Sequence, residues 1–257
     1  MTGLTMDDFD RQLRFDVINF WLDQCRPPTV AELASQGGGE GDRDETSVRR
    51  GLARLEQLHH LTLYGADVPS PTPIAMAHPF SHLPTPYLVK AGDGRAWWAN
   101  CAWCALGLAA MLYPDAAPGA NTDVAVSVHA LTAPAGALTV LTVTRDGNLV
   151  VPPQHRTDTG AEEYDLHAVF SAPPSRWWAD VRFACGTIQL CATRAEAEAW
   201  PRRHGFLDGD AVRLDALWRL AKAWYQDKHR YDYERKTPAQ REVLFRELGL
   251  TSAYWAS

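Results

Sequence analysis

The chain has 257 residues, of which 46% are hydrophobic and 22% charged, and its formal net charge is −6. This length is enough for one large domain or two small ones, and the composition is that of a globular protein. The acidic balance argues against a main role in coating nucleic acid, and no apolar run approaches the ~20 residues that span a bilayer. The polar stretch 1–10 lacks the pattern of a signal peptide, so we expect a cytosolic protein with reduced cysteines and no membrane association.

The N-terminal part of the sequence predicts three helices and then a strand. Apolar residues recur at helical spacing in the first helix, which Pro27 terminates. Thr29 and Glu32 have the capping-box spacing at the start of the second. The expected elements are helices over 7–24, 29–35 and 46–60 and a strand over 61–64. This order is typical of a winged helix, so we expect a winged-helix-like N-terminal domain over 1–68.

The helix over 46–60 would enter the major groove if this domain bound DNA. It offers three basic side chains, Arg49, Arg50 and Arg54, with acidic residues directly before them. We interpret these arginines as a solvated face and the N-terminal domain as a scaffold or lid. DNA binding through 46–60 is kept as the minority alternative.

A proline-rich connector, 68–73, is the expected domain boundary. Beyond it, 124–150 alternates β-branched residues with period two and turns at Asp146-Gly147, which predicts an antiparallel sheet. We therefore expect an α+β fold with a mixed or antiparallel sheet core, flanking helices and a C-terminal helical extension over 74–257. The further predicted elements are strands over 167–171 and 181–191 and helices over 193–200, 210–228 and from 237 onward.

Cys101 and Cys104 form a Cys-x-x-Cys pair flanked by tryptophans. If Cys101 begins a helix, both thiols face the same side one turn apart. Cys185 lies on the expected strand over 181–191. On a regular strand Cys191 would be ~20 Å from Cys185, too far to bind the same ion.

Three kinds of site agree with these thiols. A structural zinc site needs four ligands, and with no second close pair only His129, His167 and Cys191 offer candidates to complete it. A dithiol redox centre uses the same spacing, although the strand and helix context of thioredoxin is missing. Thiolate capture of a soft metal such as mercury or copper(I) is the third alternative.

The run from Cys101 to Met111 resembles the active-site helix of organomercurial (alkylmercury) lyases. Cys101 falls on the family's first catalytic cysteine, and the stretch from Asp180 to Cys185 resembles the lead to its second, which sits on a strand. The resemblance covers roughly residues 10–225 in order. It also includes the winged-helix-like start, the Thr-Pro-Tyr strand before the motif, the β segment ending in Thr-Val-Thr-Arg-Asp-Gly, and the helix with Glu196 and Trp200.

The resemblance implies protonolysis of a carbon–mercury bond, with Cys101 and Cys185 as metal-binding nucleophiles. The family has an aspartate where this chain has Cys104, and that aspartate passes a thiol proton to the departing carbon. We expect Cys104 to act as the proton relay or as a third metal ligand, although its unperturbed pKa of about 8.5 differs from ~3.9 for Asp. An alternative register places Cys104 on the catalytic cysteine and Gly107 on the aspartate. Neither register supplies an aspartate.

Trp98 and Trp103 are candidate walls of a substrate pocket, whereas His78 and His82 are interpreted as polar loop histidines. No cofactor is expected; the ligand or product is Hg(II) or another soft metal, and the partner is a small organometallic compound. Two alternatives stay open. One is a non-catalytic protein that binds or senses mercury, copper or zinc through Cys101, Cys104 and Cys185. The other is a lyase scaffold reused in a specialised biosynthetic pathway.

Overall fold

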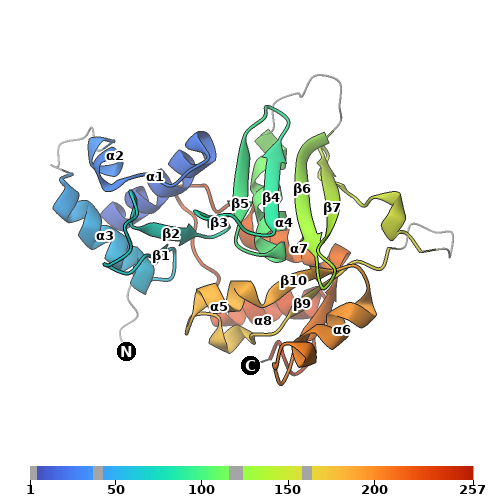
Figure 1. Cartoon of the computed structure of the whole chain (residues 1–257). Coiled ribbons are helices and arrows are strands. Elements are labelled where there is room, and N and C mark those ends of the chain that lie inside the picture. Colours follow the sequence, from blue (N-terminus) through green and yellow to red (C-terminus); the bar gives the residue numbers. More distant parts are fainter. Residues whose placement is uncertain (1–4, 37–42, 116–123, 158–163, 257) are drawn as a thin grey trace.

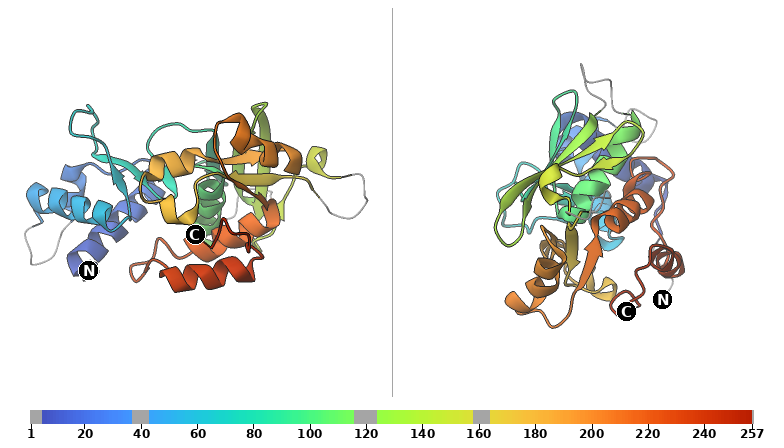
Figure 2. Two further views of the ribbon diagram at one scale, coloured as in Figure 1. Left: turned by 90° about the horizontal axis from the view of Figure 1, so that it is seen from below. Right: turned by 90° about the vertical axis from the view of Figure 1, so that its right-hand side faces the viewer.

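The computed structural model describes residues 5–36, 43–115, 124–157 and 164–256, and it has an α+β fold built on two antiparallel sheets (Figure 1). The large sheet has the strand order β1-β2-β3-β5-β4-β6-β7-β8, and the small one has the order β10-β9-β11. The right-hand view of Figure 2 shows the green and yellow strands of the large sheet above the ochre and orange strands of the small one. Within the described residues, no helix combines the length and apolar character needed to span a membrane.

Three helices and one short strand form the N-terminal part, as predicted. Thr29 accepts from the Glu32 backbone N–H while the Glu32 carboxylate accepts from the Thr29 backbone N–H, which confirms the predicted capping box. Arg54 pairs with Asp10 at 2.7 Å, so this arginine is engaged within the N-terminal part. The winged-helix assignment and DNA binding stay predictions. The elements are α1 (Asp8–Gln24), α2 (Val30–Ser35), α3 (Glu45–Gln57) and β1 (Thr62–Leu63).

The large sheet crosses the proline-rich connector, because β1 pairs with β2 on its far side. Its longest ladder joins β6 and β7, in the segment where the sequence predicts an antiparallel sheet. Gly147 has φ +80° at the expected turn, a conformation that glycine adopts without strain. The division into domains 1–68 and 74–257 stays a prediction. The remaining strands are β2 (Ile74–Ala77), β3 (Phe80–Ser81), β4 (Tyr87–Ala91), β5 (Ala96–Ala99), β6 (Val124–Thr132), β7 (Ala137–Thr144) and β8 (Leu149–Val150).

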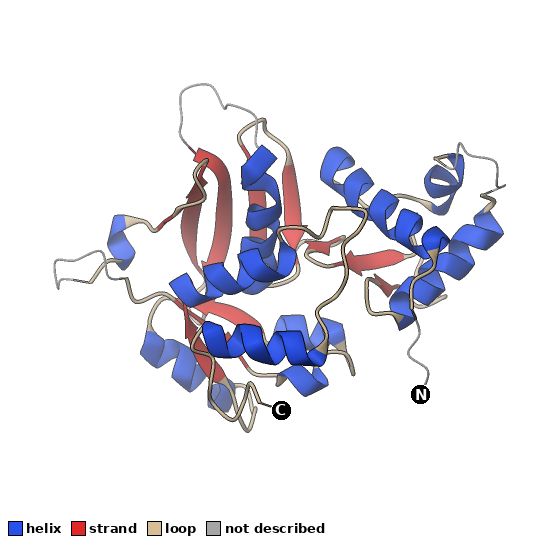
Figure 3. Cartoon of the chain, turned by 180° about the vertical axis from the view of Figure 1, so that it is seen from behind, coloured by secondary structure: helices blue, strands red, loops and turns tan. Residues whose placement is uncertain are grey.

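Helix α4 (Ala102–Leu112) is the buried centre of the molecule, since all its residues are buried. In Figure 3, which views the molecule from behind, α4 lies in front of the large sheet, with α7 (Leu214–Tyr225) beside it. A helix that is apolar all round must be covered on every side, and the sheet and α7 provide that cover. The start of α4 therefore lies where the two sheets and the C-terminal helices meet.

The small sheet and its helices follow in the chain. The elements are β9 (His167–Phe170), α5 (Val181–Gly186), β10 (Ile188–Cys191), α6 (Arg194–Arg203), β11 (Asp210–Arg213) and α8 (Pro238–Glu247). Short 3-10 turns lie at Tyr113–Asp115, Pro153–His155 and Pro174–Arg176.

Two predictions in this half are wrong. The expected strand over 181–191 is helix α5 followed by the shorter strand β10, because the Asp180 carboxylate accepts from the Phe183 backbone N–H and caps a helix. Cys185 is therefore on a helix and not on a strand. The expected helix over 210–228 begins later, because its first four residues pair with β9 as strand β11.

Candidate functional site

The start of α4 positions the first two thiols. Asn100 anchors the turn between β5 and α4 by donating to the carbonyl oxygens of Pro79 and Phe80 at 3.1 and 2.9 Å. Cys101 is the helix N-cap, and its Sγ accepts from the Cys104 backbone N–H at 3.3 Å. Both thiols are completely buried and face the same side, as the spacing predicts. A helix N-terminus also favours negative charge, and so a thiolate.

Cys185 completes a cluster of three buried thiols. The Sγ atoms of Cys101, Cys104 and Cys185 all lie within 4.8 Å of one another. Thiolates bound to one zinc ion at ~2.3 Å can be up to ~4.6 Å apart, so this spacing is close to that of ligands sharing an ion. Across the described ranges, no other group of three or more cysteine, histidine or acidic side chains is placed closely enough to share a metal. Cys191 lies elsewhere and packs with Val169 and Trp200.

Two further side chains touch the thiols, His78 and Tyr225, and the sequence did not single out Tyr225. His78 is buried, and its Nε2 lies 3.4 Å from the Cys185 Sγ, so the interpretation as a loop histidine is wrong. The Tyr225 hydroxyl lies 3.5 Å from the Cys104 Sγ. The other loop histidine, His82, bonds to the Tyr64 hydroxyl at 3.0 Å instead.

The three thiols differ in how readily they ionise. Burial opposes ionisation of Cys104, but its contacts with Cys101 and Cys185, and with His78 and Tyr225, hold its pKa well below the usual value. Burial, followed by the contact with Cys104, raises the pKa of Cys101. Contacts with Cys101 and Cys104, followed by burial, raise the pKa of Cys185. The cluster therefore favours one thiolate, at Cys104, with two thiols beside it.

An aromatic cavity opens beside the Cys185 thiol. Its wall includes four tryptophans, and the free space of about 40 Å³ holds on the order of one or two waters. Trp103 is central to this wall, with its ring 5.3 Å from that of Trp177 and 5.1 Å from that of Trp224. Trp98, the other tryptophan expected at a pocket, pairs with Ser81 and Leu88 in the large sheet and is not among the residues lining this cavity.

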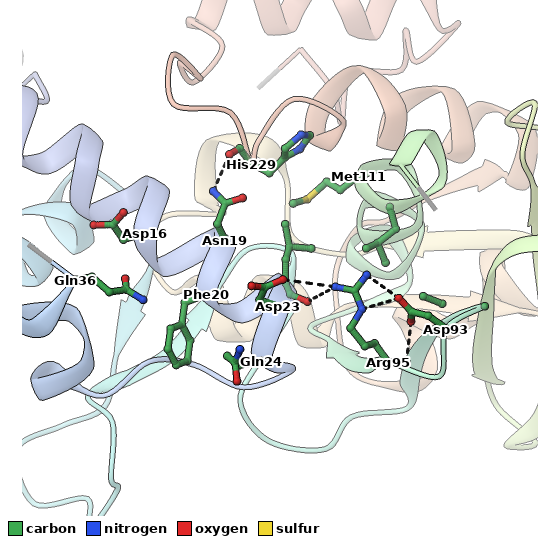
Figure 4. A pocket seen from close by; sticks show the side chains of 14 residues that line it. Asp16, Asn19, Phe20, Asp23, Gln24, Gln36, Asp93, Arg95, Met111 and His229 are labelled. Atoms are coloured by element: carbon green, nitrogen blue, oxygen red, sulfur yellow. Dashed lines mark hydrogen bonds and ion pairs between the residues drawn. The ribbon is translucent and has the colours of Figure 1, made fainter. Parts of the chain in front are cut away.

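A larger pocket of about 590 Å³ lies between α1 and the β4–β5 turn (Figure 4). Its lining contains no cysteine. Polar contacts join the elements around this pocket. Asn19 donates to the His229 carbonyl oxygen at 3.0 Å, and Arg95 donates to the Leu22 carbonyl oxygen at 3.1 Å. Of these two pockets, only the smaller one has a thiol of the cluster, that of Cys185, in its wall.

A buried thiol cluster on an α+β scaffold defines a protein suited to soft metals. The family model described as "MerB: Alkylmercury lyase" matches residues 80–226, which is more than half of the chain and includes all three clustered cysteines. The chain belongs to the alkylmercury lyase family. A solved structure, the "Crystal structure of the mercury-bound form of MerB2", matches the fold with a TM-score of 0.56 at 18% identity, covering 86% of this chain and 95% of that one. Among curated proteins no match is found.

Proposed function

We propose that the protein cleaves the carbon–mercury bond of a small organomercurial by protonolysis and keeps the released Hg(II) on its thiolates. The observation that carries this proposal is the cluster of Cys101, Cys104 and Cys185, with sulfur atoms within 4.8 Å of one another. Soft thiolates favour Hg(II) over hard cations. Reduced thiols also suit a reducing compartment, so the proposed site of action is the cytosol.

The charge distribution of the cluster supports a sequence of steps. The Cys104 thiolate binds the mercury first, and Cys101 and Cys185 then bind with loss of their protons. One of these two protons ends on the departing carbon to give the hydrocarbon, and the other leaves the site. The products are the hydrocarbon and Hg(II) held by three thiolates, so charge and atoms balance. In this scheme Cys101 and Cys185 keep their expected roles as nucleophiles, and Cys104 is a third ligand.

The small cavity supports a small organic group on the mercury. Free space of about 40 Å³ accommodates a methyl group, whereas an aromatic ring would require the tryptophans to move. Methylmercury is therefore the substrate chosen for the test.

The test incubates the purified protein with methylmercury and excess free thiol and measures methane in the headspace and Hg(II) in solution. We expect the wild type to release methane and Cys101→Ser or Cys185→Ser to release no more than a protein-free sample, because each loses a mercury ligand. Cys25→Ser is the matched control, since Cys25 is a free cysteine outside the cluster, and it should behave as the wild type does.

A second function is favoured by the thiol at position 104. Three thiolates hold Hg(II) more tightly than two, so Cys104 suits a protein that stores or senses a soft metal without turnover. In that case the wild type would bind one Hg(II) per chain and release no methane. Protein purified without added mercury would also carry a soft metal that Cys101→Ala lacks.

A further inference from the structure

Lys228 is a buried lysine in the wall of the thiol cavity. Its exposed fraction is 5%, and it lines the same space as Cys185 and Trp103. Among the described residues its ammonium group has no carboxylate or hydrogen-bond partner. It lies only over the ring faces of Tyr225, at 5.4 Å, and Tyr233, at 5.9 Å. Lysines are almost never buried without a partner, so this position demands a reason other than stability.

The backbone around Lys228 is fixed, which keeps its side chain in the cavity. Its N–H donates to the Tyr225 carbonyl oxygen at 2.9 Å, just after α7 ends. Its own carbonyl oxygen accepts from Arg14 of α1 at 2.7 Å, and the next carbonyl, of His229, accepts from Asn19 at 3.0 Å. The chain therefore cannot turn Lys228 outward without breaking contacts with α1.

The surroundings of Lys228 allow it to hold and to give a proton. Burial, followed by the positive charge of Arg235, lowers its pKa to about 7, while the Cys104 thiolate acts in the opposite direction. Ammonium and amine forms are then both populated near neutral pH, which is the condition for an efficient general acid. The titratable and charged groups that face it or line the same cavity are Arg14, His59, His60, His78, Cys104, Cys185, Tyr225, Tyr233, Arg235 and Lys236.

The tyrosine and the histidine that contact the thiols are less suited than Lys228 to give a proton to carbon. No carboxylate lines the described cavity. Burial, followed by the neighbouring thiolates, raises the pKa of Tyr225 well above its usual value. His78 has its Nε2 against Cys185.

We propose that Lys228 is the catalytic general acid of this lyase and supplies the proton that the family's aspartate would have supplied. The inference rests on the proposed function. In the step, the electron pair of the carbon–mercury bond takes a proton from the Lys228 ammonium. The hydrocarbon leaves, Lys228 becomes a neutral amine, and mercury keeps its thiolates as Hg(II). Lys228 regains a proton from a cysteine thiol as that thiol binds mercury, or from solvent.

The test is a single turnover of methylmercury by Lys228→Met. The variant should still capture methylmercury, measured as loss of titratable thiols, because the cluster is intact. Methane release should slow by ~10²–10⁴-fold, the range for losing a general acid. The wild-type rate should fall as the pH rises through about 7, where the ammonium is lost, and the Lys228→Met rate should lose this dependence. The matched control is Lys222→Met, which removes a lysine over the Trp218 ring outside the cavity.

Chemical rescue distinguishes the loss of a proton donor from a loss of structure in the Lys228 variants. Lys228→Ala should regain methane release with added methylamine, whose cation carries a transferable proton, and not with tetramethylammonium, which carries none. Release by Lys228→Met within a few-fold of wild type, with an unchanged pH profile, would overturn the role of Lys228 while leaving the lyase proposal intact. Absence of methane from the wild type itself would overturn both.

Discussion

Cys104 is the residue at which this chain departs from the pattern that the alkylmercury lyase resemblance implies. Its thiol sits within 4.8 Å of both other thiols, so it is placed to bind the metal and not only to pass a proton. Its low pKa makes it the first thiolate of the cluster. In the proposed reaction, a thiolate in the place of an acid gives the metal a third soft ligand and leaves the proton to another group.

Replacing Cys104 by aspartate should make the protein release bound Hg(II) faster. With two thiolates instead of three, we expect Cys104→Asp to transfer Hg(II) to a competing dithiol at least ~10-fold faster, which corresponds to an activation barrier lower by ~1.4 kcal/mol. Transfer is followed by the absorbance of the mercury–thiolate bonds. Cys104→Ser is the control, because it removes the same ligand without adding a carboxylate and should lose Hg(II) equally fast. Retention of Hg(II) as in the wild type by both variants would show that Cys104 is not a ligand.

Packing of α4 against α7 brings Tyr225 to the thiols. Gly107 makes this possible, because a Cβ built on it would lie 2.2 Å from the Tyr225 Cδ2. Alanine normally stabilises a helix interior by up to ~1 kcal/mol over glycine. At Gly107 we expect the steric cost of the overlap with the buried Tyr225 ring to exceed that gain in free energy.

We therefore expect Gly107→Ala to lower the free energy of unfolding by ~1–3 kcal/mol, the range for overpacking a core. The shift of the urea midpoint at constant m-value measures it. Gly186→Ala is the control at the end of α5, where nothing lies within 4 Å of the added methyl group, and it should not lower stability. An unchanged midpoint in Gly107→Ala would mean that α7 moves away from α4 at no cost.

Local sequence signals predicted the elements that depend on local interactions. The capping box of Thr29, the helix start at Cys101 and the antiparallel hairpin around Gly147 are found as expected. The strand expected over 181–191 is wrong over 181–186, which form helix α5 with Phe183 53% exposed. The cap residue before it, Asp180, was the better signal.

Contacts between distant residues could not be predicted in the same way. Tyr225 is 121 positions from the Cys104 thiol that it touches, and His78 is 107 positions from Cys185. Cys185 joined the predicted site only through the family resemblance. No sequence motif marks Lys228, because its burial at 5% exposure in the cavity wall is visible only in the folded chain.

At the scale of the whole molecule, the N-terminal helices hold the C-terminal segment that closes the site. Arg14 of α1 donates to carbonyl oxygens of Lys228 and of Tyr231, and Arg235 donates to the Leu58 carbonyl oxygen at 2.8 Å. The segment after α7 is thus clamped between α1 and the end of α3. These contacts support the expected role of the N-terminal part as a scaffold.

Where the N-terminal helices meet this C-terminal segment, a junction formed by Arg14, Lys228 and Arg235, positive charges surround a buried histidine. His60 follows α3 with an exposed fraction of 5%. Its ring is nearly perpendicular to that of Tyr233, with the ring centroids 6.5 Å apart. Burial, followed by the charges of Lys228, Arg235 and Arg14, lowers its pKa to about 2. The unfolded chain binds a proton at this residue near pH 6.5, whereas the folded chain does not. Because the unfolded state then holds more protons below pH 6.5, acid should destabilise the fold.

We expect the wild-type free energy of unfolding to fall below pH 6.5, with His60 contributing up to ~1.4 kcal/mol per pH unit. His60→Leu removes this group, so its stability should depend less steeply on pH between 6.5 and 4.5, by that amount. A residual slope of the same sign should remain, because burial also lowers the pKa of His78, to about 4. Urea midpoints measured across this range test the difference, and above pH 7.5 the two proteins should show equal slopes. Parallel curves below pH 6.5 would mean that His60 takes up its proton in the folded state, and that the junction opens to water.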